Sequence, residues 1–196
     1  MDFNAIIKRA INVITKPNDE FQAIKGEKMT IADMYVKYAI FLAAIPAIAR
    51  FIGLLLLPFG TRLFGRFLIG SILLYVLSLG GLYVLAFIID TLAPNFGGKK
   101  DINSSLKIAV FSYTAAWIGG ILYIIPSQPF WILAGLAGIY TLYLLYVGMK
   151  NLKEVPQDKM VGYYVVTIIV AIIIFFIIGL IVSTIIWGRF GGYFYM

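Results

Sequence analysis

Arg50 is the residue of this chain whose position most strongly suggests chemistry, because it lies within an apolar stretch, FLAAIPAIARFIGLLLLP (residues 41–58). Pro46 precedes it by four residues, and a proline inside a helix leaves the carbonyl of Leu42 without its usual hydrogen-bond donor. Charged residues within apolar spans are rare and usually mark binding sites or ion pathways. The pair therefore predicts either a polar binding site or a tolerated irregularity in a membrane helix.

The expected depth of Arg50 identifies its expected neighbours. Arg50 lies about seven residues from the outer end of its span, which is roughly 10 Å at the helical rise. Counting along antiparallel spans to the same depth gives five polar or aromatic residues, namely Ser71, Tyr75, Trp117, Ser183 and Thr184. We expect the guanidinium to contact hydroxyls, carbonyls or an outer-leaflet phosphate, without a protein counter-ion. Snorkelling toward the outer surface beside a kink and a true binding role both remain open.

Other chemistry-bearing groups are scarce. The chain has no histidine and no cysteine, which removes the commonest metal ligands, thiol chemistry and the usual neutral-pH base. It also has no phosphate-binding loop spacing, and no carboxylate pair lies inside an apolar stretch. Asp90, at the end of a span, is expected beside Lys99 or Lys100. We predict no catalytic residue, cofactor or metal site, and no enzyme.

Composition indicates an integral membrane protein. Hydrophobic residues make up 62% of the chain and charged residues 13%, with a mean hydropathy of +0.96, whereas soluble domains have about 45–50% apolar and 25% charged residues. Helical spans need roughly 20 apolar residues. Five stretches meet or approach this length: 36–57, 67–89, 105–126, 130–149 and 162–187. The predicted fold is all-α, and the net charge of +7 indicates lipid surfaces, not nucleic acid.

Lysine and arginine placement predicts the orientation. Six basic residues in the N-terminal segment, three in the second loop and three in the fourth share one side, against Arg62, Arg66 and Arg189 on the other. Because basic loops stay in the cytoplasm, we expect a multi-pass cell-membrane protein with a cytoplasmic N-terminus and an external C-terminus. The domain plan is a cytoplasmic segment (1–34), a five-helix membrane domain (35–187) and an aromatic outer tail (188–196).

The N-terminal segment predicts an amphipathic helix that ends before Pro17. Its apolar residues recur at helical spacing, at Phe3, Ile6, Ile7, Ala10, Ile11 and Ile14. We expect this helix to lie at the membrane interface, and packing on the cytoplasmic face of the bundle is the alternative. Four cations are predicted to meet anionic lipids at the membrane surface, namely Lys8, Arg9, Lys99 and Lys100. Thr30 and Asp33 have capping-box spacing.

Small residues within the spans predict close helix approaches. They are Gly80, Gly81, Gly119, Gly120, Ala134 and Gly138. Small side chains let helices pack closely in lipid. Packing within the bundle and formation of a homo-oligomer both use such notches, and the sequence leaves both open.

Two segments carry a resemblance to a known family. They are FGGKKDINSSLKIAVFSYTAAWIGGILYIIPS and LAGLAGIYTLYLLYVGMKNLKEVPQDKMVGYYVV, supported by the proline-containing segment before the first span. In order and spacing they resemble the Yip1 domain family, which implies a cytoplasmic N-terminus followed by five spans. The chain departs from prokaryotic relatives at Ala115, where many have a proline that would kink the helix.

The resemblance implies little about activity. Eukaryotic Yip1 relatives act in membrane traffic and bind prenylated Rab-type GTPases, but this chain lacks their D-L-Y-G-P motif and their long N-terminal region, so Rab binding is not expected. One hypothesis is a non-enzymatic protein that organises the membrane or recruits an unknown cytoplasmic partner. The alternative is a small transporter or channel for an anionic solute, with a cavity near Arg50.

Overall fold

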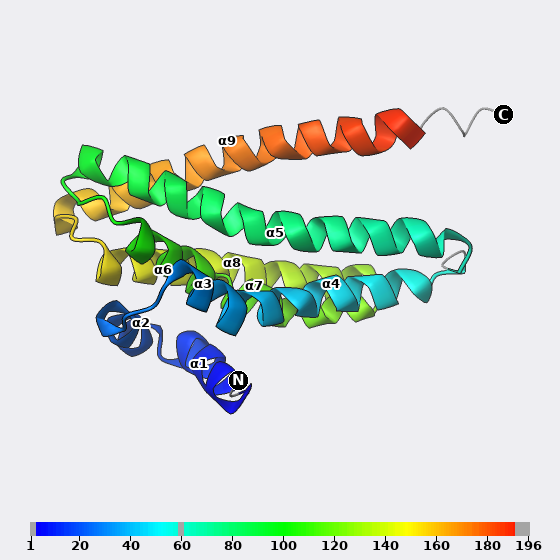
Figure 1. The fold of residues 1–196 in the computed structure, drawn as a ribbon, viewed down its shortest axis with the longest axis horizontal. Coiled ribbons are helices and arrows are strands. Elements are labelled where there is room, and N and C mark those ends of the chain that lie inside the picture. Colours follow the sequence, from blue (N-terminus) through cyan, green and yellow to red (C-terminus); the bar gives the residue numbers. More distant parts are fainter. Residues whose placement is uncertain (1–2, 59–60, 191–196) are drawn as a thin grey trace.

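The computed structural model describes residues 3–58 and 61–190, with side chains except those of residues 63, 66 and 178–190. The described residues form helices, as predicted (Figure 1). In chain order they are α1 (Phe3–Thr15), α2 (Pro17–Gly26), α3 (Ile31–Met34), η1 (Tyr35–Ala39), α4 (Ile40–Leu55), η2 (Thr61–Leu63), α5 (Phe64–Leu92), η3 (Ala93–Phe96), α6 (Ile102–Ser112), α7 (Thr114–Gly119), η4 (Gly120–Ile124), α8 (Gln128–Leu152) and α9 (Gln157–Phe190).

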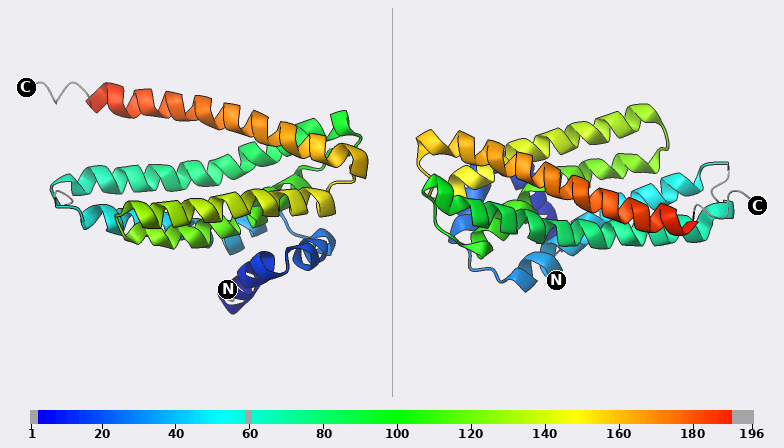
Figure 2. Two further views of the ribbon diagram at one scale, coloured as in Figure 1. Left: turned by 180° about the vertical axis from the view of Figure 1, so that it is seen from behind. Right: turned by 90° about the horizontal axis from the view of Figure 1, so that it is seen from above.

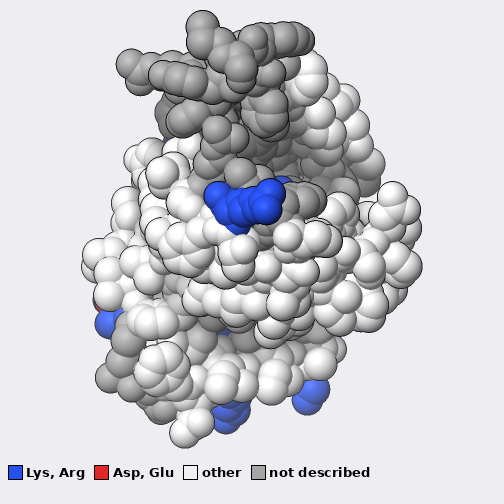
Figure 3. All heavy atoms as spheres, turned by 90° about the vertical axis from the view of Figure 1, so that its right-hand side faces the viewer, with Lys and Arg blue, Asp and Glu red and all other residues white. Residues whose placement is uncertain are grey.

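Five helical segments are long and apolar enough to cross a membrane, which confirms the predicted number. They run over Ile31–Leu55, Phe67–Phe96, Ile102–Ile124, Gln128–Leu152 and Gln157–Ile177. They lie roughly side by side along the long axis, with α9 diverging from the others (Figures 1 and 2). Loops 97–101 and 153–156 meet near α2 at one end, called the lysine-rich end. The other end, called the Arg50 end, shows in Figure 3 a mostly white surface with basic side chains near its centre.

The predicted punctuation of the N-terminal region is confirmed. Lys16 has a non-helical backbone, with a φ of −135°. Pro17 takes the first position of α2, where its missing N–H costs no helical hydrogen bond. Thr30 and Asp33 form a reciprocal capping box: the Asp33 amide donates to the Thr30 hydroxyl at 3.1 Å, and the Thr30 amide donates to the Asp33 carboxylate at 3.0 Å. The span therefore begins at α3, five residues before the predicted start.

The third span is interrupted even though the chain has Ala115 at the position where a kinking proline would be expected from the resemblance. Helix α6 ends at Ser112 and α7 begins at Thr114. The Thr114 hydroxyl donates to the Phe111 carbonyl at 2.7 Å, and it also lies 2.8 Å from the Tyr38 hydroxyl. Hydroxyls that bond to the preceding turn compete with the helix ladder and bend helices. Thr114 thus accounts for a break in the third span at a place where the sequence has no proline.

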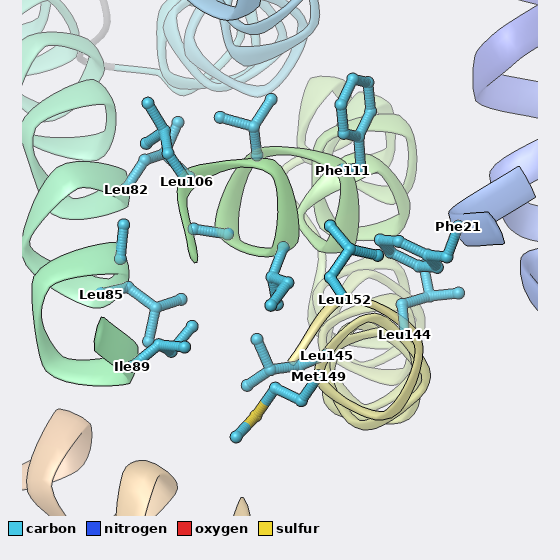
Figure 4. Close-up of a cluster of buried hydrophobic side chains, with 14 of the residues drawn as sticks. Phe21, Leu82, Leu85, Ile89, Leu106, Phe111, Leu144, Leu145, Met149 and Leu152 are labelled. Carbon is cyan, nitrogen blue, oxygen red and sulfur yellow. The ribbon is translucent and has the colours of Figure 1, made fainter. Parts of the chain in front are cut away.

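The core is centred on α6, which is buried between α5, α8 and α2. Figure 4 shows Leu82, Leu85 and Ile89 of α5 facing α6, and Phe21 of α2 reaching toward α6 and α8. The third span is the most enclosed of the five, because 56% of its most apolar stretch is buried, against 22% for the described part of the fifth. Among the residues of α9 whose side chains are described, Tyr163, Thr167 and Ala171 are buried on the side that packs on α5 and η3.

Only some of the predicted small residues lie where two helices approach closely. A Cβ built at Gly119 would overlap that of Ala137, and one at Gly120 would lie 2.5 Å from the Pro46 Cβ. A Cβ at Gly81 would lie 3.2 Å from the Phe175 ring, and Ala134 is buried. Gly80 and Gly138 face open space, so close packing within the chain is wrong for these two residues.

Two close approaches escaped the sequence analysis. Gly53 lies directly against the Tyr123 carbonyl, and Gly148 lies against the Phe21 ring. Gly53 does have a small residue four positions earlier, Ala49, whereas Gly148 has leucines at both such positions. The partner of Gly53 comes from η4 at the end of the third span, and the partner of Gly148 comes from the N-terminal helix α2, which lies outside the spans.

Candidate functional site

Arg50 lies in a shallow groove at the Arg50 end. The groove has a volume of about 200 Å³ and lies between α4, η4 and the start of α8. Its lining is Arg50, Gly53, Leu54, Tyr123, Pro126 and Trp131. The Arg50 side chain is exposed and makes no ion pair or hydrogen bond to another residue that the structure describes. The groove therefore offers a cation framed by two aromatic side chains.

The residues predicted to surround Arg50 are dispersed. Ser71 and Tyr75 line a separate groove of about 300 Å³ between α4 and α5, which does not include Arg50. The Tyr75 hydroxyl donates to the Ile40 carbonyl at 3.0 Å. Trp117 is buried, and the side chains of Ser183 and Thr184 lie outside the described part of the chain. Pro46 packs on Gly120, so it contributes to the contact between α4 and η4.

Arg9, predicted to meet lipid headgroups, is the centre of a different site in which its guanidinium contacts protein groups. Its guanidinium donates to both carboxylate oxygens of Glu27, at 2.8 and 2.5 Å, and lies 3.4 Å from Glu20. It also lies 5.6 Å from the centre of the Phe111 ring. The hydrogen bonds that the guanidinium donates to Glu27 raise the pKa of Arg9 above its ordinary value. Arg9 therefore points toward the bundle and fastens α1 to α2 and α6.

Lys107 anchors the same region from inside. The sequence counted it as a loop cation, but its side chain is buried and its amine donates to the carbonyls of Ile24 at 2.9 Å and Glu27 at 2.6 Å. These carbonyls lie at the end of α2, where a helix leaves its last acceptors unpaired. A cation there also meets the negative end of the helix dipole. The signal for this role is its position inside the apolar run SSLKIAVF.

Asp90 pairs with Lys153, so the expected contact with Lys99 or Lys100 is wrong. The Lys153 amine lies 3.0 Å from Asp90, and the two side chains are 2% and 14% exposed. The amine also donates to the Asp101 carbonyl at 3.1 Å, while the Asp101 amide donates to Asp90 at 2.6 Å. This cluster, called the loop clasp, joins the end of α5 to both loops of the lysine-rich end.

The carboxylate of Asp101 has a second role as the N-cap of α6. It accepts hydrogen bonds from the Asn103 and Ser104 amides at 3.0 and 3.3 Å and from the Ser104 hydroxyl at 2.5 Å. Burial alone would raise its pKa, but these bonds together with Lys153 hold the pKa of Asp101 below its usual range. The clasp thus fixes where the third span begins.

A larger groove opens beside Arg9. It has a volume of about 650 Å³ and lies between α1 on one side and α3 and η1 on the other. Its apolar lining includes Ile6, Met34, Tyr38 and Phe111, and Lys28 and Lys37 lie along it. The name α1 groove is used for it below. A volume of this size falls within the range of about 300–1,000 Å³ typical of ligand sites.

Helix α1 keeps an exposed apolar row on its other side. Phe3, Ile7 and Ile11 are 59%, 56% and 54% exposed, while Ala10 and Val13 are buried against the bundle. The Tyr140 hydroxyl donates to the Ile14 carbonyl at 2.7 Å, and the Phe3 ring meets Phe41 edge-on at 5.6 Å. One side of α1 thus packs on the bundle, as one interpretation of the segment expects, while the other side presents the exposed apolar residues that an interfacial position would require.

The remaining predicted surface cations are exposed. Lys8 lies on α1, and Lys99 and Lys100 lie in the loop after α5, where the Lys99 amine lies 3.3 Å from Glu154. Arg9 is thus the exception among the four, because its guanidinium is turned inward.

Comparisons with known proteins agree with this architecture. Residues 11–186 match the model of the Yip1 domain. The chain is 25% identical to the inner membrane protein YohC of Escherichia coli K12 over 184 residues, covering 90% of this chain and 94% of the relative. The same protein from Escherichia coli O6:H1 matches with the same identity and coverage. No solved structure matches. With its five membrane helices and a family match over nearly its whole length, the chain belongs to the Yip1 domain family.

Proposed function

We propose that the protein is a non-enzymatic membrane protein that organises the cytoplasmic leaflet around itself and presents its lysine-rich end to cytoplasmic partners. The observation that carries this proposal is the position of α1. The helix is fixed to the bundle by Arg9 and by Tyr140, yet it exposes Phe3, Ile7 and Ile11 along its outer side. An apolar row with basic residues beside it is typical of helices that lie in the lipid interface.

Rigid attachment distinguishes α1 from a free amphipathic tail. One residue of its apolar row, Phe3, contacts Phe41 of the first span, while Ile7 and Ile11 remain exposed. A helix fixed in this way inserts at a constant depth and displaces headgroups on one side of the bundle. Lys8, which is exposed, lies next to Ile7 in the chain and would meet anionic headgroups.

The depth of α1 is measurable because the chain contains no cysteine. Spin labels on Ile7→Cys and Lys8→Cys, in vesicles containing phosphatidylglycerol, test it directly. We expect label 7 to collide more with oxygen and label 8 more with a water-soluble nickel complex. Ile172→Cys on the exposed side of α9 and Lys100→Cys in a loop supply the lipid and water references. Equal water access at labels 7 and 8 would remove the basis of the proposal.

Orientation is a separate expectation. The proposal requires the lysine-rich end to lie in the cytoplasm, because basic loops are retained there. Lys100→Cys should react with a membrane-impermeant maleimide only after cells are permeabilised, whereas Arg62→Cys should react in intact cells. Both residues are exposed in the structure. The reverse labelling pattern would invert the topology and contradict the proposal.

An anion transporter built around Arg50 is the second candidate, and the exposed guanidinium in its own groove favours it. Its weakness is geometric, since Ser71 and Tyr75 line a different groove. Flux of chloride or phosphate into proteoliposomes that disappears in Arg50→Leu would support it. We prefer the first function because several contacts anchor α1 to the bundle, whereas Arg50 lies in its groove without the polar residues predicted to surround it.

A further inference from the structure

The α1 groove has an interior suited to an apolar occupant. Its polar groups are already engaged: the Tyr38 hydroxyl pairs with Thr114 at 2.8 Å, and Arg9 is held by Glu27 and Glu20. What these residues offer to the groove is therefore the faces of rings and hydrocarbon stems. Leaving a groove of this kind to water costs free energy in proportion to its apolar area.

The mouth of the groove has a different chemistry. Lys28 is exposed and makes no hydrogen bond or ion pair with the residues that the structure describes. Lys37 is exposed and pairs with Asp33 at 2.6 Å, and Asp33 is also engaged by Thr30. Both carboxylates of the lining, Glu27 and Asp33, already have partners. The free charge at the mouth is thus positive.

The groove also opens where lipid is the surrounding medium. Val36, on its wall, is an exposed residue of the first span, Ile31–Leu55. Beyond it, Phe3 of α1 leans on Phe41 of the same span. Acyl chains therefore adjoin the mouth from the side, while Lys28 lies before the start of the span and Lys37 lies next to Val36 within it.

We propose that the α1 groove binds one anionic phospholipid of the cytoplasmic leaflet. An acyl chain lies over Ile6, Tyr38 and Phe111, and the phosphate lies between Lys28 and Lys37. The inference rests on the proposed function, because that function places the lysine-rich end in the cytoplasm. It goes further by assigning a bound lipid to a defined site, in place of a general attraction for the membrane surface.

Photo-crosslinking of the full-length protein tests this assignment. The probes are phosphatidylglycerol and phosphatidylethanolamine carrying a diazirine in the acyl chain, each added to vesicles of the two unmodified lipids. We expect phosphatidylglycerol adducts on Ile6, Val36 and Tyr38 in excess over phosphatidylethanolamine adducts. Lys28→Gln should reduce the phosphatidylglycerol adducts about fivefold, the effect of one lysine near a lipid surface.

Two further variants make the test specific. Val36→Trp fills the mouth from an exposed position and should remove the adducts of both probes. Lys99→Gln removes an exposed cation outside the groove lining and should change neither. Adducts spread evenly over the exposed sides of α5 and α9, or a Lys28→Gln result equal to Lys99→Gln, would overturn the site. Crosslinking of the groove residues to a polypeptide in native membranes would also overturn the lipid site, because the occupant would then be a peptide.

The outcomes separate the two proposals. If the label on Ile7→Cys is immersed but the groove gives no preferential adducts, the bound lipid is wrong and the proposed function stands. If the label is in water and the impermeant reagent finds Lys100→Cys outside the cell, the proposed function fails first.

Discussion

Asp90→Ala is expected to lower the free energy of unfolding by about 3 kcal/mol, because it leaves a buried ammonium without its counter-ion. The Lys153 side chain is 2% exposed and has Asp90 as its carboxylate partner at 3.0 Å. The same substitution removes the acceptor of the Asp101 amide, which lies 2.6 Å from the carboxylate. Equilibrium unfolding of the purified protein in mixed micelles, followed by helical circular dichroism, measures the loss.

The matched control for the loop clasp connects the same two loops. Lys99 lies 3.3 Å from Glu154, but these side chains are 86% and 61% exposed. Exposed pairs contribute about 0–1 kcal/mol, so Lys99→Ala should leave stability nearly unchanged. Replacing both Asp90 and Lys153 with leucine should recover part of the loss, since no buried charge then remains. Equal losses in Asp90→Ala and Lys99→Ala would contradict the clasp.

Gly119→Ala is expected to destabilise the protein by up to about 2 kcal/mol, because overpacking costs about 1–3 kcal/mol and the higher helix propensity of alanine returns up to about 1 kcal/mol. Its new methyl group would overlap the Cβ of Ala137, where α7 meets α8. The gain in helix propensity is about 1 kcal/mol in a helix interior. It opposes the overpacking cost but is smaller than the upper end of that cost. The same unfolding assay measures the change, and Ala137→Gly in the same chain should restore most of the lost stability because it removes the overlapping atom.

Two glycines that the sequence grouped with Gly119 serve as controls. Gly138 adjoins Ala137 in α8, and Gly80 lies in α5; a Cβ at either would meet no other residue within 4 Å. Gly138→Ala and Gly80→Ala should therefore leave stability unchanged or raise it by up to about 1 kcal/mol. If all three substitutions have the same effect, the close approach of α7 and α8 is incorrect.

The sequence was informative wherever a property depends on neighbours in the chain. The five spans follow from runs of apolar residues, since a bilayer imposes length and composition on each helix separately. The Thr30–Asp33 capping box and the end of α1 before Pro17 are likewise local, because backbone groups within a few residues satisfy them. These features needed no knowledge of how the helices pack.

The candidate site was much less accessible to sequence reasoning. Counting residues gives the depth of Ser71, Tyr75 and Arg50 in a membrane but not the rotation of each helix about its axis. Rotation decided that Ser71 and Tyr75 line one groove and Arg50 another. Helical periodicity likewise placed Arg9 on a polar side without showing that Glu27 and Phe111 would cover it.

By itself, the sequence determined the membrane class of the protein, its all-helical fold, the number of spans and its family. Only the tertiary structure decided which charges meet: Arg9 with Glu27, Lys107 with the end of α2, and Asp90 with Lys153. The physical reason is that hydrophobicity acts along one segment at a time, whereas a buried charge takes whichever partner packing brings within hydrogen-bonding distance.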